Sequence, residues 1–184
     1  MKNKIIIVTG QCATGKSTFA RRLSQVLGVP FFCKDTLKEA LADGIGREAA
    51  RAAGPRLSEA TFETIMHIAE QMFRVEQSAI LEANFKPREC ERLRSLIDKY
   101  GYDCLSYVFT GNLRVLCDRY KRRDDAGERH WSHVRGGEYG EAFVKGQKPL
   151  GEFAIGKSIR VDATDFAAVD YDGLHRYAVE FMRG

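Results

Sequence analysis

The sequence predicts a three-layer α/β fold, in which a five-stranded parallel sheet carries helices on both faces. Two observations support this prediction. Apolar runs of strand length alternate with amphipathic segments of helix length along almost the whole chain. The first predicted strand, residues 5–9, is almost continuously apolar and ends at Gly10, as is typical of a strand buried on both sides. Strands that alternate with helices form parallel sheets, because each connection crosses one face of the sheet.

Each further element follows from its local pattern. The remaining strands are predicted at residues 29–33, 79–85, 104–110 and 157–161, and the helices at 16–27, 36–41, 58–77, 87–100, 112–123 and 172–182. Residues with known preferences for helix ends support these limits, namely Gly28, Ser58, Pro87 and Asn112. Residues 43–55 are rich in Gly, Ala and Arg and predict a loop or a loosely packed excursion. Residues 124–153 are polar and glycine-rich.

Length and composition limit the class of protein. The chain has 184 residues, of which 44% are hydrophobic and 29% charged, with a formal net charge of +4. These values fit a single domain over residues 1–184 and argue against wholesale disorder. Neither a membrane span nor a signal peptide is evident, so we expect a cytoplasmic protein. The five cysteines show no paired spacing, which predicts free thiols, several of them buried.

The segment from Gly10 to Ser17 matches the P-loop (Walker A) pattern G-x-x-x-x-G-K-[ST] between a strand and a helix. The two glycines allow the loop to wrap so that its N–H groups point at phosphate oxygens. We expect Lys16 to reach the β- and γ-phosphates and Ser17 to hold Mg²⁺. The expected nucleotide-binding residues are Gly10, Gln11, Cys12, Ala13, Thr14, Gly15, Lys16, Ser17 and Thr18. The alternative is an ordinary glycine turn. With the strand–helix pattern, the motif predicts a P-loop NTPase fold.

The rest of the chain narrows the kind of nucleotide protein. No Asn-Lys-x-Asp segment is present, which counts against a GTPase. No strand ends in Asp-Glu, which counts against the motor and helicase ATPases; the third predicted strand offers Glu82 and then Asn84 instead. At this length the small kinases remain the natural group.

Four stretches resemble the P-loop small-molecule and nucleic-acid kinases, a group that includes polynucleotide kinases, chloramphenicol phosphotransferases, zeta-toxin-like kinases, and gluconate and shikimate kinases. They are the P-loop with its helix, Phe31–Lys38, Leu81–Phe85 and Leu116–Arg123. The resemblance implies an ATP- and Mg²⁺-dependent kinase that acts on a small-molecule hydroxyl. It also implies an acceptor-binding excursion at about 42–77 and a mobile lid at about 124–153.

The same resemblance implies roles for single residues. Asp35 would face the acceptor hydroxyl, and Asn84 would line the acceptor pocket. Polynucleotide kinases carry an arginine where this chain has Lys38, which weakens an inference to a polynucleotide substrate while leaving Lys38 a candidate for acceptor binding. Arg119 would reach the adenine side and Arg123 the phosphates. Thr164 follows the last predicted strand, where the resemblance places the adenine.

Position in the sheet supports these roles independently. Ligands of open parallel sheets bind at the carboxyl ends of the strands, and Gly10, Asp35 and Asn84 all follow strands at that edge. A carboxylate at position 35 can accept the hydroxyl proton or hold a water on the metal. The alternative, which is compatible with catalysis, is that Asp35 caps the helix that it opens.

Basic residues and histidines supply further candidates. Arg119 and Arg123 share a helix face, and Arg122 is expected to point elsewhere or into the lid. Within the lid, Arg129 or Arg135 is a candidate phosphate ligand. Glu63 and His67 are candidates for the acceptor pocket, and Arg47, Arg51 and Arg56 are candidates for binding an anionic acceptor. For His130 and His133, a solvated loop is favoured over a metal site or a substrate contact.

Two alternatives to the small-molecule kinase stay open. A nucleotide-binding switch or scaffold would bind ATP tightly but transfer little phosphate. A nucleic-acid-end kinase would bind oligonucleotides in a strongly salt-dependent way, although no basic stripe interleaved with aromatic residues suggests it. The sequence names neither the acceptor nor the oligomeric state.

Overall fold

The computed structural model describes residues 3–134 and 139–184. Its five strands form one parallel sheet in the order β2-β3-β1-β4-β5. The strands are β1 (Lys4–Gly10), β2 (Phe31–Cys33), β3 (Ala79–Glu82), β4 (Asp103–Thr110) and β5 (Lys157–Asp162). The predicted sheet is therefore confirmed, with β2 and β3 shorter than expected.

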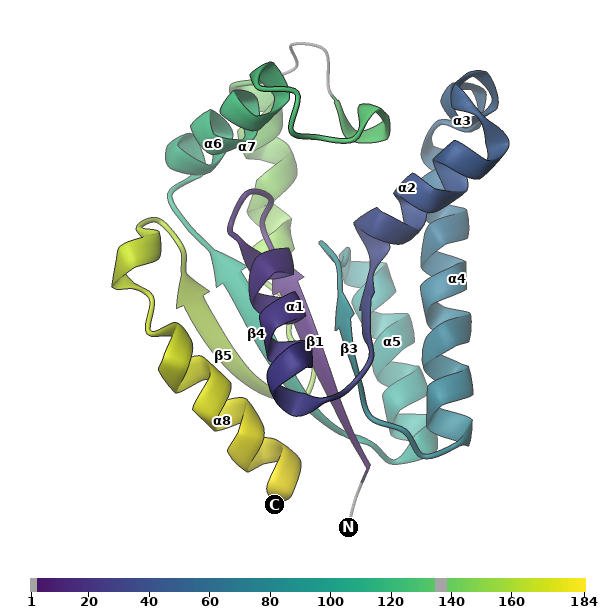
Figure 1. Cartoon of the computed structure of the whole chain (residues 1–184), viewed down its shortest axis with the longest axis vertical. Helices are drawn as coiled ribbons and strands as arrows, with labels where there is room; N and C mark the ends of the chain where they lie inside the picture. The colour runs from purple at the N-terminus through teal and green to yellow at the C-terminus, as the bar shows by residue number, and fades with distance from the viewer. Residues whose placement is uncertain (1–2, 135–138) are drawn as a thin grey trace.

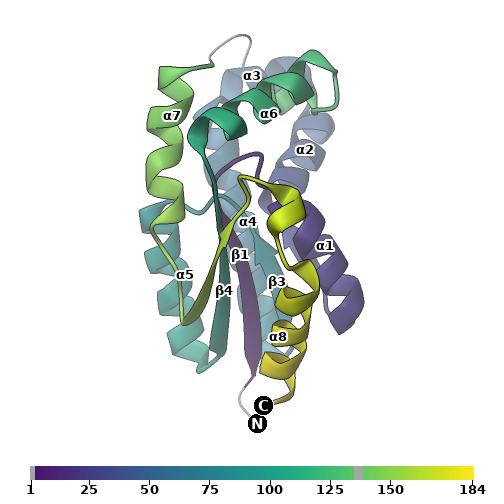
Figure 2. The same ribbon diagram turned by 90° about the vertical axis from the view of Figure 1, so that its left-hand side faces the viewer.

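Helices cover both faces of this sheet, as Figures 1 and 2 show. One face carries α1 (Lys16–Leu27) and α8 (Tyr171–Arg183), and the other carries α4 (Pro55–Arg74) and α5 (Pro87–Tyr100). The alternation of side chains along β1 explains the two layers. Ile6 and Val8 pack with α1 and α8, whereas Ile5 and Ile7 pack with α4 and α5. α1 and α5 have the limits that the sequence predicts.

The segment between β2 and β3 is more helical than the sequence predicts. Three helices fill it, namely α2 (Lys34–Ile45), α3 (Arg47–Ala53) and α4. Of the loop or loosely packed excursion expected at 43–55, the loop is wrong, because the alanine-rich stretches there are helical. Gly46 and Gly54, both at positive φ, only divide the segment. The predicted N-cap at Ser58 is also wrong, since α4 begins at Pro55 with Gly54 as its N-cap.

The polar stretch after β4 contains α6 (Leu113–Asp125) and α7 (Glu141–Gln147), which lie above the sheet in Figure 1. This stretch also contains two short 3-10 helices, η1 (Trp131–His133) and η2 (Lys148–Gly151), and a third, η3 (Phe166–Ala168), follows β5. Asn112 caps α6 as predicted, since its side chain accepts hydrogen bonds from the amides of Arg114 and Val115. The predicted lid includes Arg135, which lies outside the described residues.

The strand register brings the ends of the inner strands to one edge of the sheet. Val8 and Cys33 both pair with Glu82, and Gly10 pairs with Phe109. The P-loop, the start of α2 and the end of β3 therefore meet there, which is where parallel sheets bind their ligands. In the part of the chain that the structure describes, no helix combines the length and the apolar character needed to cross a membrane.

Candidate active site at the carboxyl edge of the sheet

The P-loop takes a conformation that its glycines make possible. At Gly10 the φ angle is +121°, and a Cβ would lie 2.0 Å from the main-chain oxygen of Phe109. Gly15, at φ +77°, forms the N-cap of α1, and no side chain caps the first turn of that helix. Uncapped N–H groups at the positive end of a helix favour an anion. The loop therefore fits a phosphate group.

Side chains within the loop hold this shape. The Thr14 hydroxyl and the Lys16 ammonium both donate to the main-chain oxygen of Gln11, at 2.9 and 3.2 Å. The Gln11 side-chain oxygen accepts from the amide of Gly111 at 3.0 Å. Gln11 and Thr14 were expected to contact the nucleotide, and the structure places both side chains in these internal bonds.

Glu82 is the central acid of the site. It ends β3, is 2% exposed, accepts a hydrogen bond from the Ser17 hydroxyl at 3.0 Å and lies 3.7 Å from the Lys16 ammonium. Burial raises the pKa of Glu82, and the Lys16 charge opposes that shift. The Cys33 thiol adjoins it, and burial together with the Glu82 charge raises the pKa of Cys33 to about 12. A hydroxyl and a carboxylate are oxygen ligands of the kind that Mg²⁺ prefers.

Asp35 lies in the first turn of α2, close to Glu82. Its side chain is exposed, and its charge contributes to raising the pKa of both Glu82 and Cys33. The alternative that Asp35 caps this helix is wrong, because Cys33 occupies the N-cap position and no side chain makes the capping bond. Asp35 is therefore an exposed carboxylate beside the Ser17–Glu82 pair.

Asn84 lies directly against the P-loop. Its side-chain amide is 2.7 Å from the Cys12 sulfur.

The five cysteines are free, and all except Cys12 are buried, which agrees with the prediction of free thiols, several of them buried.

Arg119, Thr164 and Phe166 come together at the far end of the P-loop. The Arg119 guanidinium donates to the main-chain oxygens of Ala163 and Thr164 at 2.6 and 2.7 Å. It also stacks on the Phe166 ring at 3.8 Å from the centroid. The structure thus places Arg119 beside the segment where the sequence predicts the adenine.

Two cavities adjoin this cluster. One, of about 450 Å³, is lined by Ala13, Gly15, Thr18, Arg119, Arg122, Arg123, Glu128 and Phe166. Arg122 was expected to point elsewhere or into the lid, and it lines the same cavity as Arg119 and Arg123, together with Glu128 of the predicted lid. Arg123 lies 3.7 Å from Glu128.

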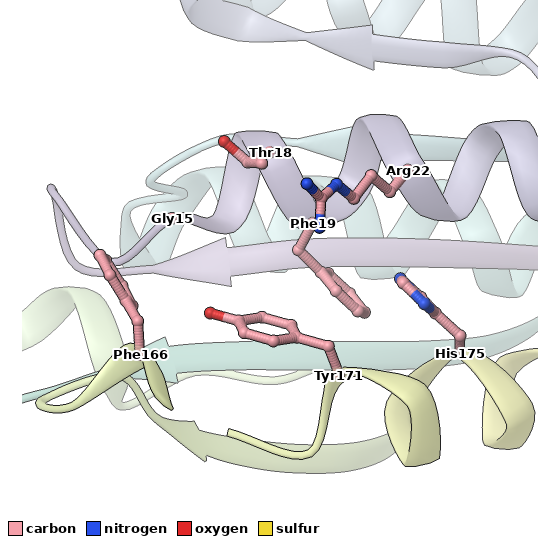
Figure 3. A pocket seen from close by; sticks show the side chains of 7 residues that line it. All are labelled: Gly15, Thr18, Phe19, Arg22, Phe166, Tyr171 and His175. Carbon is pink, nitrogen blue, oxygen red and sulfur yellow. The ribbon is translucent and has the colours of Figure 1, made fainter. Parts of the chain in front are cut away.

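The second cavity, of about 200 Å³, lies between α1 and the segment after β5. In Figure 3, Phe166 and Tyr171 of that segment face Gly15 of the P-loop and Phe19 of α1. His175 stacks on the Phe19 ring at 5.1 Å between centroids. The two cavities are neighbours, since both are lined by Gly15, Thr18 and Phe166.

Residues 130–133, which we call the clasp, join the predicted lid to the predicted acceptor-binding excursion. His130 and the Trp131 indole both bond to the Asp43 carboxylate, at 3.0 and 3.1 Å. The Lys38 ammonium donates to the main-chain oxygen of Ser132 at 3.3 Å, and Trp131 lies under the guanidinium of Arg47. The clasp therefore docks on α2 and α3.

His133 faces the same helix from the end of the clasp. Its ring lies 3.3 Å from the carboxylate of Glu39. Burial lowers the pKa of His133, while the charges of Asp35 and Glu39 raise it and those of Lys38 and Arg129 lower it. Neither histidine of the clasp belongs to a metal cluster: within residues 3–134 and 139–184, no group of three His, Cys, Asp or Glu side chains is arranged to hold a metal.

Other predicted residues lie away from this edge. Glu63 pairs with Arg92 of α5, at 2.5 and 2.8 Å, in an exposed groove that His67 also lines. Arg129 packs on the Tyr120 ring and pairs with the buried Asp124 at 2.8 Å. Arg51 and Arg56 are exposed on α3 and α4. The structure does not bring these side chains to the P-loop cavities.

Comparison with known proteins agrees with this geometry. The family AAA_33, described as an AAA domain, matches residues 5–135. The chain belongs to the AAA_33 family. The matched range includes the P-loop with the strand and helix on either side of it, and also Asp35, Glu82 and Arg119. No curated protein matches the sequence.

Similar solved structures share the whole fold. A protein from Chloroflexus aurantiacus j-10-fl, described as a "putative kinase", is 26% identical with a TM-score of 0.83, and the match covers 98% of both chains. A gluconokinase from Sinorhizobium meliloti 1021 is 18% identical with a TM-score of 0.57, covering 98% of this chain and 92% of that one. A shikimate kinase from Bacteroides thetaiotaomicron is 15% identical with a TM-score of 0.58, covering 98% and 99%. The family match and these structures support the predicted resemblance to P-loop kinases, and the solved structures confirm the predicted fold.

Sequence reasoning left several residues of this edge without a role. Glu82 could have been found from the sequence, because it is a lone acid at the end of a buried strand. The sequence analysis considered only an Asp-Glu pair at that position. Phe166 and Gln147 had no comparable signal, because their places depend on contacts with the distant P-loop. Asp43 was assigned to a loop and is in fact the α2 partner of the clasp.

Proposed function

We propose that the protein is an ATP- and Mg²⁺-dependent kinase that transfers the γ-phosphoryl group to a hydroxyl of a small molecule. The observation that carries this proposal is the cluster of Lys16, Ser17 and Glu82 beside the exposed Asp35. At one edge of the sheet, this cluster combines groups that can bind a phosphate, bind a divalent cation and accept the proton of the acceptor hydroxyl. The similarity to the solved structure described as a "putative kinase" supports the same class of reaction.

The residues fit the two groups that the reaction requires. The uncapped first turn of α1 and the glycine conformations of the P-loop suit a triphosphate. Ser17 and Glu82 would hold Mg²⁺, and burial of the Glu82 carboxylate is a cost that a divalent cation would offset. The metal, when bound, would stabilise negative charge on the transferring phosphoryl group. The nucleoside would lie along the two cavities, with its base near Arg119 and Phe166.

Transfer of the γ-phosphoryl group requires a new bond between oxygen and phosphorus and a group that accepts the proton of the hydroxyl. The acceptor hydroxyl oxygen forms a bond to the γ-phosphorus while the bond from that phosphorus to the β–γ bridging oxygen breaks, and ADP leaves. The Asp35 carboxylate accepts the hydroxyl proton. Lys16 neutralises the phosphates, and Arg123 contributes positive charge from the wall of the larger cavity. Lys38 and Asn84 are the candidates for holding the acceptor.

The test begins with a panel of hydroxyl compounds, including sugars and antibiotics, scored by ADP release with Lys16→Ala as the inactive control. With an acceptor in hand, Asp35→Asn should lower the transfer rate at least about 100-fold. The matched control is Glu48→Gln, which neutralises an exposed acid on α3 of the same excursion and should leave the rate unchanged. An unaltered rate in Asp35→Asn would exclude Asp35 as the base. Tight ATP binding without transfer to any compound would instead favour a nucleotide switch.

A further inference from the structure

Gln147 is an unusual residue for its position. It ends α7, a surface helix, yet it is 2% exposed. Glutamine is mostly found exposed, and a buried amide group requires hydrogen-bond partners. Its partners lie in the P-loop, more than 130 residues earlier in the chain.

Two hydrogen bonds connect Gln147 to the loop. Its side-chain oxygen accepts from the main-chain amide of Cys12 at 2.8 Å. Its main-chain oxygen accepts from the side-chain amide of Gln11 at 3.4 Å. Because the Gln11 side-chain oxygen also accepts from the amide of Gly111, one chain of bonds runs from α7 through the loop to the end of β4.

The bond to Cys12 lies next to a strained position. Ala13 has φ +58°, a left-handed conformation that a residue with a Cβ rarely adopts. Such conformations persist where the surrounding structure holds them in place. Phe143, four residues before Gln147 and on the same helix face, is fully buried in a cluster that Cys12 and Ala13 join. Thus α7 presents one apolar and one polar side chain to this part of the loop.

We propose that Gln147 is a positioning residue for nucleotide binding: its side-chain oxygen fixes the Cys12 peptide and so holds the P-loop in its phosphate-binding shape before the nucleotide arrives. This inference rests on the proposed function, since it assumes that the loop binds a nucleotide. A preorganised loop binds more tightly because less conformational entropy is lost on binding. Gln147 itself needs no contact with the nucleotide.

The test replaces Gln147 by methionine, which has a similar shape but cannot accept the Cys12 bond. Calorimetry with ATP and Mg²⁺ should show a dissociation constant raised about tenfold, as expected when a buried N–H loses its partner. Hydrogen exchange of the Cys12 amide, followed by NMR without nucleotide, should accelerate in the same variant. The shorter Gln147→Asn, whose oxygen falls short of Cys12, should show both effects and serves if the methionine variant does not fold.

Ser106→Ala is the matched control. Ser106 is equally buried and bonds both the amide and the oxygen of Ile155, away from the P-loop. Its loss should lower stability without changing the affinity for ATP or the exchange of Cys12. Wild-type affinity and wild-type Cys12 exchange in a folded Gln147 variant would overturn the inference. If the wild-type protein binds no nucleoside triphosphate, the proposed function fails, and so does the role of Gln147 in binding, whereas altered Cys12 exchange would still show that Gln147 holds the loop.

Discussion

The proposed nucleotide side and the proposed acceptor side of the site are held in different ways. On the nucleotide side, Lys16, Glu82 and Gln147 are buried and bonded to one another or to the P-loop. On the acceptor side, the clasp docks on α2 largely through polar groups, of which the Asp43 side chain is 62% exposed. Exposed polar contacts contribute little stability, whereas buried ones cost much to break. We infer a rigid phosphate site beside an acceptor wall, formed by α2 and the clasp, that is free to adapt.

The largest effect is expected for Glu82→Gln, which tests the buried side of this comparison. Phosphate transfer should fall about 100-fold or more, because the carboxylate beside Ser17 is lost. Stability should change little near neutral pH, because glutamine removes a buried charge and keeps an oxygen for the Ser17 bond, while the buried Lys16 ammonium loses its charged partner. Burial raises the pKa of Glu82, so its ionised form is disfavoured in the folded protein, and the cost removed by Gln grows as the pH rises above the ordinary Glu value. Thermal melting and ADP release measure the two effects; a large loss of stability would show that the charge supports the fold.

The second largest effect is expected where we propose that the nucleobase of ATP binds. Arg119→Lys should raise the KM for ATP about tenfold, because lysine cannot bond both carbonyls and stack on Phe166 together. The control is Arg114→Lys, on the same helix but at a different cavity. An unchanged KM in Arg119→Lys would place the nucleotide base elsewhere.

A smaller effect is expected at the clasp. Burial lowers the pKa of His133, so the folded protein binds this proton less readily than the unfolded chain. The stability that depends on neutral His133 is present above the unfolded pKa of about 6.5 and is lost as the pH falls below it. His133→Gln should therefore make the decrease in Tm between pH 7 and pH 5 smaller than in the wild type. A larger decrease in the variant would mean that the charge pair with Glu39 outweighs burial.

The smallest effect is predicted for Glu63→Gln. Glu63 was a candidate for acceptor binding, and its exposed pair with Arg92 lowers its pKa. We expect a stability change below about 1 kcal/mol and transfer within about twofold of the wild type. A KM for the acceptor raised tenfold would extend the acceptor wall to the α4–α5 groove.

The predictions from local pattern succeeded where one segment contains all the information. β1, the P-loop and α1 follow one another, and their apolar run, glycines and amphipathic spacing specify them without outside help. The excursion at 43–55 was mistaken for a loop because its glycines suggested breaks, whereas its alanines and the packing of Ala42, Ala50 and Leu57 favour helices. Glu82 lay at a readable position, at the end of a buried strand.

The sequence by itself determined the parallel sheet, the phosphate-binding loop and the edge at which Asp35 and Asn84 would meet it. These features depend on residues within a few positions of one another and on the general geometry of parallel sheets. Only the tertiary structure decided that Gln147 bonds to Cys12, that Phe166 stacks on Arg119 and that the clasp rests on Asp43. Each of these contacts joins segments far apart in the chain, and packing of the complete core sets which side chains face one another.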